Sequence, residues 1–146
     1  MIIIFSAVLV FSITGYVAYS GGEIQQSVES VRIEVQTDEA EYANGENITG
    51  NVFVVNDGET DIAITGYAYK VKSSQSDVEF GADFIFGSDF NLVVPANSRA
   101  ALFAIEPDII QKLGIVPGPC KMTFTVDLWG IENYDGVGEV TFTVIK

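Results

Sequence analysis

The chain has 146 residues and a net charge of −13 at pH 7; 48% of its residues are hydrophobic and 18% are charged. It contains no histidine and a single cysteine, Cys120, which excludes an intrachain disulfide and any catalytic or metal site built on histidine. The strong acidity, without a basic patch, argues against nucleic acid as a partner, because phosphate repels such a surface.

The N-terminal segment carries no charge. The first charged residue is Glu23, so residues 1–22 are uncharged and mostly apolar. As an α-helix, 22 residues would span roughly 33 Å, which matches the hydrocarbon core of a bilayer. We therefore predict that residues 1–30 form a hydrophobic assembly or membrane helix followed by a polar linker.

Three fates are open to this segment. Ala18-Tyr19-Ser20 has the small–large–small pattern of a signal-peptide cleavage site, but no Lys or Arg precedes the apolar run, and the run is long. The second fate is a permanent single-span membrane anchor. The third is the assembly helix of a filament, in which many such helices pack into a central bundle.

The predicted helix contains small residues that could form a packing surface, and two glycines follow near its end. Small residues permit close helix–helix approach in an apolar medium. Their alternative role is filler, since single-span anchors contain them too. Gly21 and Gly22 then predict a hinge or break, although an apolar spacing further on would also let the helix continue past them. The predicted helix-packing residues are Ser6, Ser12, Thr14 and Gly15.

From Val31 onward the apolar residues alternate with polar ones, which is typical of half-buried strands. Turn signals at Asn44-Gly45, Asn56-Asp57-Gly58 and Asp135-Gly136 separate them. We predict a mainly β protein in which residues 31–146 form an antiparallel β-sandwich of immunoglobulin-like architecture. The expected strands are 31–36, 48–55, 61–71, 92–94, 99–105, 121–128 and 139–145. Residues 78–86 are expected as a poor strand or a structured loop, and 107–113 as a short helix.

No motif for catalysis or for a cofactor stands out. A nucleophilic Cys120 would need a base, and no histidine exists, so a buried structural cysteine is expected. The acidic runs at 38–41 and 57–61 lack the EF-hand spacing and are interpreted as solvated surface rather than as a calcium site. We predict neither an enzyme nor a bound metal or cofactor.

Two features suggest contacts outside the domain. Asn47-Ile48-Thr49 is a sequon, so Asn47 is a predicted glycosylation site unless the match is a chance one. Aromatic residues gather between 80 and 90, either as core with a covering loop or as a subunit contact. They are Phe80, Phe84, Phe86 and Phe90. A third group could line a glycan-binding face: Tyr67, Tyr69, Trp129 and Tyr134.

The plan of the chain resembles archaeal type IV pilin-like proteins, which include archaellins, adhesive pilins and the archaellum accessory proteins FlaF and FlaG. The uncharged stretch Met1–Gly22 is similar to their hydrophobic helix. The stretch from Val52 to Thr60 is similar to the strand and Asn-x-Gly-x-Thr turn common in their domains. Two departures are the absence of a basic leader with its peptidase site and of the early glutamate of bacterial pilins, since position 5 is Phe5.

This resemblance implies an extracellular structural subunit of an archaellum or adhesive pilus. Its helices would bundle in the filament core with copies of the chain or related subunits, and its sandwiches would lie outside. The alternative is a membrane-anchored FlaF- or FlaG-like protein whose extracellular sandwich binds the surface-layer protein or the motor.

Overall fold

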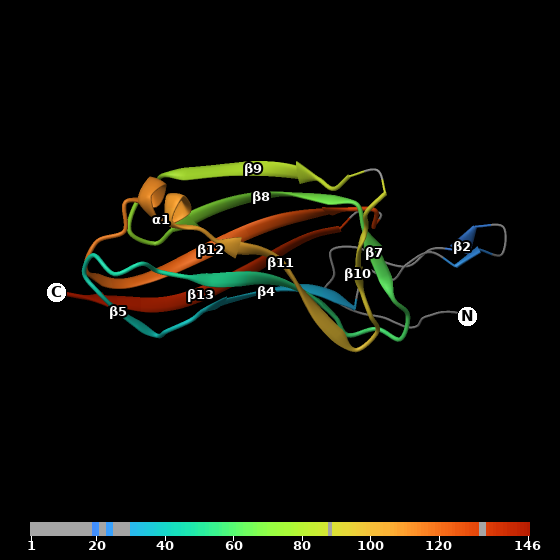
Figure 1. The fold of residues 1–146 in the computed structure, drawn as a ribbon, viewed down its shortest axis with the longest axis horizontal. Coiled ribbons are helices and arrows are strands. Elements are labelled where there is room, and N and C mark those ends of the chain that lie inside the picture. The colour runs from blue at the N-terminus through green and yellow to red at the C-terminus, as the bar shows by residue number, and fades with distance from the viewer. Residues whose placement is uncertain (1–18, 21–22, 25–29, 88, 132–133) are drawn as a thin grey trace.

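The computed structural model describes residues 19–20, 23–24, 30–87, 89–131 and 134–146. Two sheets make up the body of the molecule (Figure 1). One has three strands in the order β11 (Ser98–Ile105), β6 (Gly50–Asn56), β4 (Val31–Thr37). The other has five, in the order β5 (Glu41–Ala43), β13 (Tyr134–Ile145), β12 (Gly118–Trp129), β8 (Gly66–Ser73), β9 (Glu79–Ile85).

Three smaller elements accompany these two sheets. Strands β7 (Ile62–Ile64) and β10 (Leu92–Val94) form a separate antiparallel pair. Helix α1 (Pro107–Leu113) is the predicted short helix; it starts with proline and ends at Gly114, whose φ of 65° gives the left-handed cap that glycine favours. The mainly β prediction is therefore confirmed.

The core lies between the two sheets because the strands alternate as the sequence predicted. In β12 the even-numbered side chains from Cys120 to Leu128 are buried and those between them are more exposed. Val52 and Val54 of β6 are completely buried, as are Met122, Phe124 and Val126 opposite them. Every residue found buried in the described parts lies between Val31 and Val144, so we expect residues 30–146 to fold on their own.

Strand β4 approaches β13 very closely. A Cβ placed on Gly138 would lie 2.8 Å from Cγ2 of Ile33 and 2.9 Å from Cγ2 of Val35. No larger residue fits there without moving β4, so this glycine sets how tightly the two sheets close along β13.

Asn56 explains the Asn-x-Gly-x-Thr turn. Its side chain is 1% exposed, and its Nδ2 donates to the carbonyls of Thr60, Val94 and Pro95 at 2.8, 3.0 and 3.2 Å. Its Oδ1 accepts the N–H of Gly58 at 3.0 Å. The motif thus links the end of β6 to β10 by hydrogen bonds, so its role in this domain is structural.

Several predicted boundaries are wrong. Residues 61–71 form two strands in different sheets, because the chain crosses over at Thr65, whose N–H donates to Trp129 O at 2.8 Å. Asp135-Gly136 lies inside β13, not in a turn: a Cβ on Gly136 would collide with the ring of Tyr134, so glycine serves packing there. Strand β5 was not predicted, and it pairs with β13 in parallel, so the sandwich is not wholly antiparallel.

The predicted N-terminal helix falls mostly on residues 1–18, outside the described residues. The four described residues near its end are not helical: β2 (Tyr19–Ser20) and β3 (Glu23–Ile24) form a short antiparallel ladder. Continuation of the helix through Ile24 is therefore wrong. In the described parts of the chain, no helix is long and apolar enough to cross a membrane.

Candidate interaction surface

A chain of aromatic rings runs from the core to one side of the sandwich. Phe103 of β11 stacks on both Tyr67 and Tyr69 of β8, with ring centroids 5.1 and 4.7 Å apart. Its ring also lies 6.0 Å from that of the fully buried Phe124. Tyr67 in turn contacts Phe84 of β9, with centroids 6.0 Å apart. The core therefore continues without a break to the outermost strand.

Strand β9 extends beyond the cover of the opposite sheet. The register places Phe80, Ala82 and Phe84 beside Val71, Tyr69 and Tyr67, so these three face inward. The three-stranded sheet ends at β11, and β9 lies past the β8 residues that β11 covers (Figure 1). Phe84 is consequently 53% exposed, although it faces inward.

The loop after β9 continues this apolar surface. Phe86 packs edge-on against both Phe84 and Phe90, with centroids 5.6 and 5.2 Å apart. Phe90 is 54% exposed and Ile85, on the outward face, is 73% exposed. We call this surface the β9 patch. It consists of Phe80, Phe84, Ile85, Phe86 and Phe90.

The other end of the β9 patch is partly covered by α1. The Nζ of Lys112 lies 5.3 Å from the ring centroid of Phe80, a cation–π contact. Phe80 and Phe86 are partly buried against the core, whereas Phe84 and Phe90 are exposed. The core interpretation therefore holds for Phe80 and Phe86, whereas a subunit contact through Phe84 and Phe90 stays a prediction.

The backbone of β9 has one free side. The N–H of Phe86 donates to Thr65 O at 3.0 Å, which fixes the phase of the β8–β9 ladder: the even-numbered residues of β9 bond to β8. The N–H and C=O groups of Gly81, Asp83 and Ile85 then point to the open side. Among the described strands none pairs with that side.

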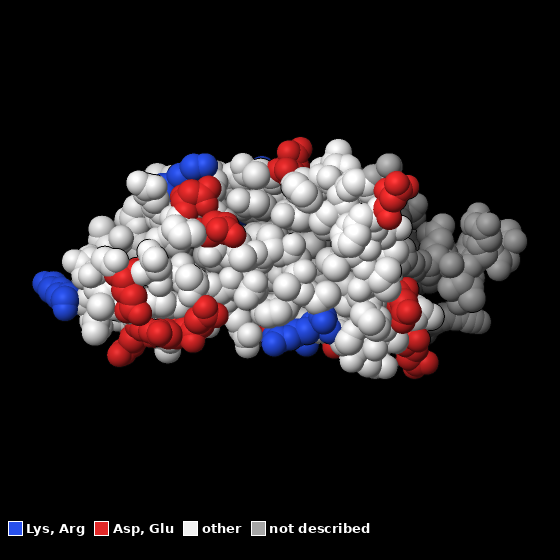
Figure 2. All heavy atoms as spheres, in the orientation of Figure 1, with Lys and Arg blue, Asp and Glu red and all other residues white. Residues whose placement is uncertain are grey.

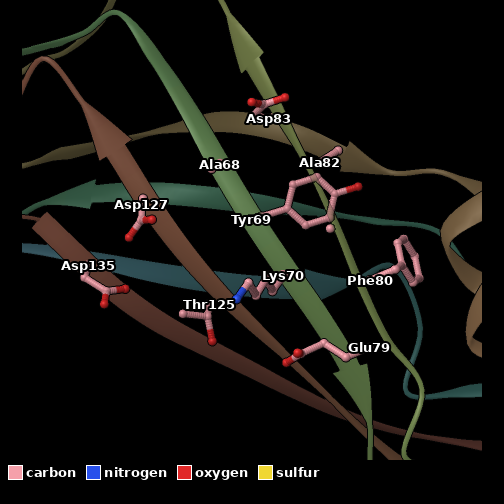
Figure 3. A pocket seen from close by; sticks show the side chains of 11 residues that line it. Ala68, Tyr69, Lys70, Glu79, Phe80, Ala82, Asp83, Thr125, Asp127 and Asp135 are labelled. Carbon is pink, nitrogen blue, oxygen red and sulfur yellow. The ribbon is translucent and has the colours of Figure 1, made fainter.

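The outward face of the same strands is polar. A shallow depression of about 620 Å³ spans β9, β8, β12 and β13. Figure 3 shows Asp127 and Asp135 side by side on neighbouring strands, with Asp83 apart from them on β9. Burial, then the neighbouring charge and hydrogen bond of Asp135, raise the pKa of the Asp127 carboxyl, while Lys70 lowers it. Among the described residues, no three or more Asp, Glu, Cys or His side chains lie close enough together to hold a metal ion.

Charge is distributed unevenly over the surface. Figure 2 shows the acidic side chains mainly toward the rim of one face, with uncharged residues across its middle. The acidic runs have structural partners: Asp57 accepts from Arg32 Nε at 2.8 Å, Asp61 from the N–H of Ala96 at 3.0 Å, and Asp38 from the Thr49 hydroxyl at 2.5 Å. These contacts fit the interpretation as solvated surface.

The remaining predicted sites are placed as follows. The helix-packing residues Ser6, Ser12, Thr14 and Gly15 and the hinge residues Gly21 and Gly22 lie outside the described residues. Asn47 is exposed in the loop between β5 and β6, and whether it carries a glycan stays a prediction.

Cys120 is 3% exposed, as predicted, and burial raises the pKa of its thiol despite hydrogen bonds from Ser73 and Ser74. The suggested glycan face is wrong, because Tyr67 and Tyr134 are buried core residues.

The free edge itself was missed by sequence reasoning. Its signal was present as an alternation of Phe80, Ala82 and Phe84, but Gly81 and Asp83 made the stretch look like a poor strand. A Cβ on Gly81 would collide with the carbonyl of Tyr69, so glycine is needed for the close pairing with β8.

No family model matches the chain, and no curated protein does either. Among solved structures, a CARDB domain from Pyrococcus furiosus, in complex with di-metal ions, has a TM-score of 0.47 and 13% identity over 79% of this chain and 87% of that one. Sporulation control protein Spo0M of Bacillus subtilis has a TM-score of 0.47 and 14% identity, over 80% of this chain and 50% of that one. AvmM, which catalyses a macrocyclization in alchivemycin A biosynthesis, has a TM-score of 0.49 and 13% identity, over 90% of this chain and 97% of that one.

Proposed function

We propose that this chain is a structural subunit of an extracellular pilus-like filament of the archaeal type. Its N-terminal segments pack together in the filament core, and its sandwich domains, with immunoglobulin-like architecture, form the outer sheath. It is not an enzyme, and its partners are copies of itself or related subunits.

The observation that carries the proposal is the separation of charge along the chain. The 20 acidic and seven basic residues all lie between Glu23 and Lys146, and residues 1–22 have none. A segment of this length and apolarity needs an apolar environment, because leaving it in water forfeits the hydrophobic free energy of every side chain. Neighbouring copies of the same segment supply such an environment, and open-ended repetition of that contact builds a fibre.

The geometry of the sandwich agrees with this arrangement. The chain joins the domain at Ser30, whose carbonyl accepts the N–H of Asp57 at 2.8 Å, next to the β7–β10 pair. The β9 patch adjoins the same pair, since β9 ends opposite Gly66, just after β7. The β9 patch and the start of β4 therefore lie at the two ends of the same β7–β10 pair, and we expect neighbouring domains to crowd together at this end of the sandwich.

Electron microscopy of the full-length protein tests the proposal. We expect long uniform fibres with the N-terminal segments at their centre. Discrete particles that need detergent for solubility would contradict the filament and favour the membrane-anchored accessory protein.

A matched pair of variants makes the test specific to the segment. Ser12→Phe should abolish fibres, since a bulky ring prevents close packing, while Ser12→Ala keeps a small side chain and should assemble normally. Normal fibres from Ser12→Phe would contradict a packed core at this position.

A further inference from the structure

We propose that β9 is a homotypic contact edge: two copies of the chain pair their β9 strands antiparallel about a two-fold axis through Ala82. The two five-stranded sheets then become one continuous sheet. This inference concerns residues 30–146 alone and does not depend on the proposed function.

The first support is that β9 is a long and unprotected edge. It has seven residues, and its Phe84 and Ile85 are 53% and 73% exposed, as is Val78 just before it at 47%. Natural edge strands are usually guarded by charged residues, above all lysine, by proline, by a bulge or by very short length. β9 contains neither lysine nor proline, only the carboxylates Glu79 and Asp83, and no described strand pairs with the N–H and C=O groups on its outer side.

The second support is that the β9 sequence is complementary to itself. Ala82 is the centre of Glu79–Ile85, so an axis through it gives the largest overlap. This register sets Phe80 opposite Phe84 of the second copy, and the reverse, on the inner face. Each copy's Tyr67 already contacts its own Phe84, so the aromatic row extends across the junction. Cross-strand aromatic pairs of this kind stabilise sheets.

Neighbouring registers are worse because they bring like charges together. An axis through Asp83 sets that carboxylate opposite itself, and an axis through Gly81 sets Glu79 opposite Asp83 of the second copy. Like charges directly opposite one another destabilise a strand pair. Only the Ala82 register combines full overlap with an uncharged partner for each carboxylate.

The third support is electrostatic. In the Ala82 register, Asp83 of the second copy lies opposite Gly81, which has no side chain, and the next residue along that row is Lys70 of β8. Two strand spacings, about 9.6 Å, separate the two backbones, and a lysine side chain can bridge most of that distance. Each copy thus offers a lysine to the other's aspartate. Repulsion between two acidic chains opposes the contact but is screened beyond about 8 Å at physiological salt.

The hydrogen-bond phase also fits this register. Because Ala82 bonds to β8, the Ala82 pair would be a non-hydrogen-bonded one, with Cα atoms about 4.5 Å apart. Gly81 and Asp83 would exchange the N–H and C=O groups that now point outward. A two-fold contact closes at two copies. It would therefore join two anchored chains or two neighbouring fibres side by side, not extend a fibre.

Cysteine cross-linking of the full-length chain in mild detergent tests the register. A separation of about 4.5 Å between Cα atoms lies within disulfide range, so Ala82→Cys in a Cys120→Ser background should give a covalent dimer under a mild oxidant. The control is Ala104→Cys, an exposed position on β11. No cross-link at Ala82, or equal cross-linking at both positions, would overturn the proposal.

A second measurement does not rely on introduced cysteines. The N–H of Asp83 points away from β8, so Asp83→Pro removes a donor from the free edge without removing one from the β8–β9 ladder. Sedimentation of residues 30–146 should show a concentration-dependent dimer for the unaltered domain and for Asp83→Asn. Asp83→Pro should weaken it at least tenfold while the circular dichroism spectrum stays unchanged. A monomer at all concentrations, or a folded Asp83→Pro that still dimerises normally, would overturn the proposal.

Discussion

The two edges of the five-stranded sheet end in different ways. At one edge, β5 has three residues, and its Tyr42 is 2% exposed and packs edge-on against Phe142. At the other edge, β9 has seven residues, and its Phe84 is half exposed beside a backbone whose outer side pairs with no described strand. Because the β5 edge is short and buries its aromatic residue, we infer that the long, partly apolar β9 edge is suited to pairing with a partner strand.

The contrast predicts unequal costs of removing an aromatic ring. The Tyr42 hydroxyl donates to Thr49 O and accepts the N–H of Glu39, both at 3.0 Å. Tyr42→Ala should therefore cost about 3–5 kcal/mol of unfolding free energy, as for other buried aromatic residues. Phe84→Ala should cost less than about 1 kcal/mol in a dilute monomer. Urea denaturation of residues 30–146 measures both, and equal costs would remove the contrast.

Glycine substitutions sharpen the same comparison. Gly138→Val places a side chain against Ile33 and Val35, where β13 packs on β4. It should lower the free energy of unfolding by about 1–3 kcal/mol through overpacking. A Cβ on Gly87, in the loop after β9, meets nothing within 4 Å. Gly87→Val should leave the melting temperature almost unchanged, and a larger drop for Gly87→Val than for Gly138→Val would contradict the packing described.

A charge swap tests the lysine–aspartate contact across the open edge. The dimer contains two such contacts, so Lys70→Glu should weaken dimerisation by about two- to thirtyfold, the range expected for the loss of two cross-strand ion pairs. Combining it with Asp83→Lys should restore most of the affinity, as sedimentation would measure. No recovery in the double variant would argue against the Ala82 register.

The smallest effect concerns the outward acidic pair. Because the folded-state pKa of Asp127 is raised, the folded state binds this proton more tightly than the unfolded state does. Proton binding by Asp127 therefore stabilises the fold below the ordinary aspartate pKa, and this contribution is lost as the pH rises through the pKa of Asp127 in the folded state. Asp127→Asn should thus be slightly more stable than the unaltered domain at pH 7, by roughly 0.2–1 kcal/mol, and no more stable at pH 3. A gain that persists unchanged at pH 3 would contradict this cause.

The alternation of apolar residues predicted most strands because β12 and β13 each have one buried face. It could not show that residues 61–71 divide at Thr65, since both halves alternate and only pairing partners distinguish them. Nor could it show that Asp135-Gly136 lies in a strand, because the reason is the ring of Tyr134 above that glycine. The β9 edge was hidden likewise: which inward residues stay uncovered depends on where the opposite sheet ends.

Amide hydrogen exchange in residues 30–146, measured at increasing protein concentration, tests the open edge most directly. The N–H groups of Phe80, Ala82 and Phe84 should be protected at every concentration, because they face β8. Those of Gly81, Asp83 and Ile85 should exchange rapidly in dilute solution and become protected as the concentration rises, while Tyr42 on β5 does not change. Exchange at Gly81, Asp83 and Ile85 that is independent of concentration would contradict the pairing of β9 with a second copy.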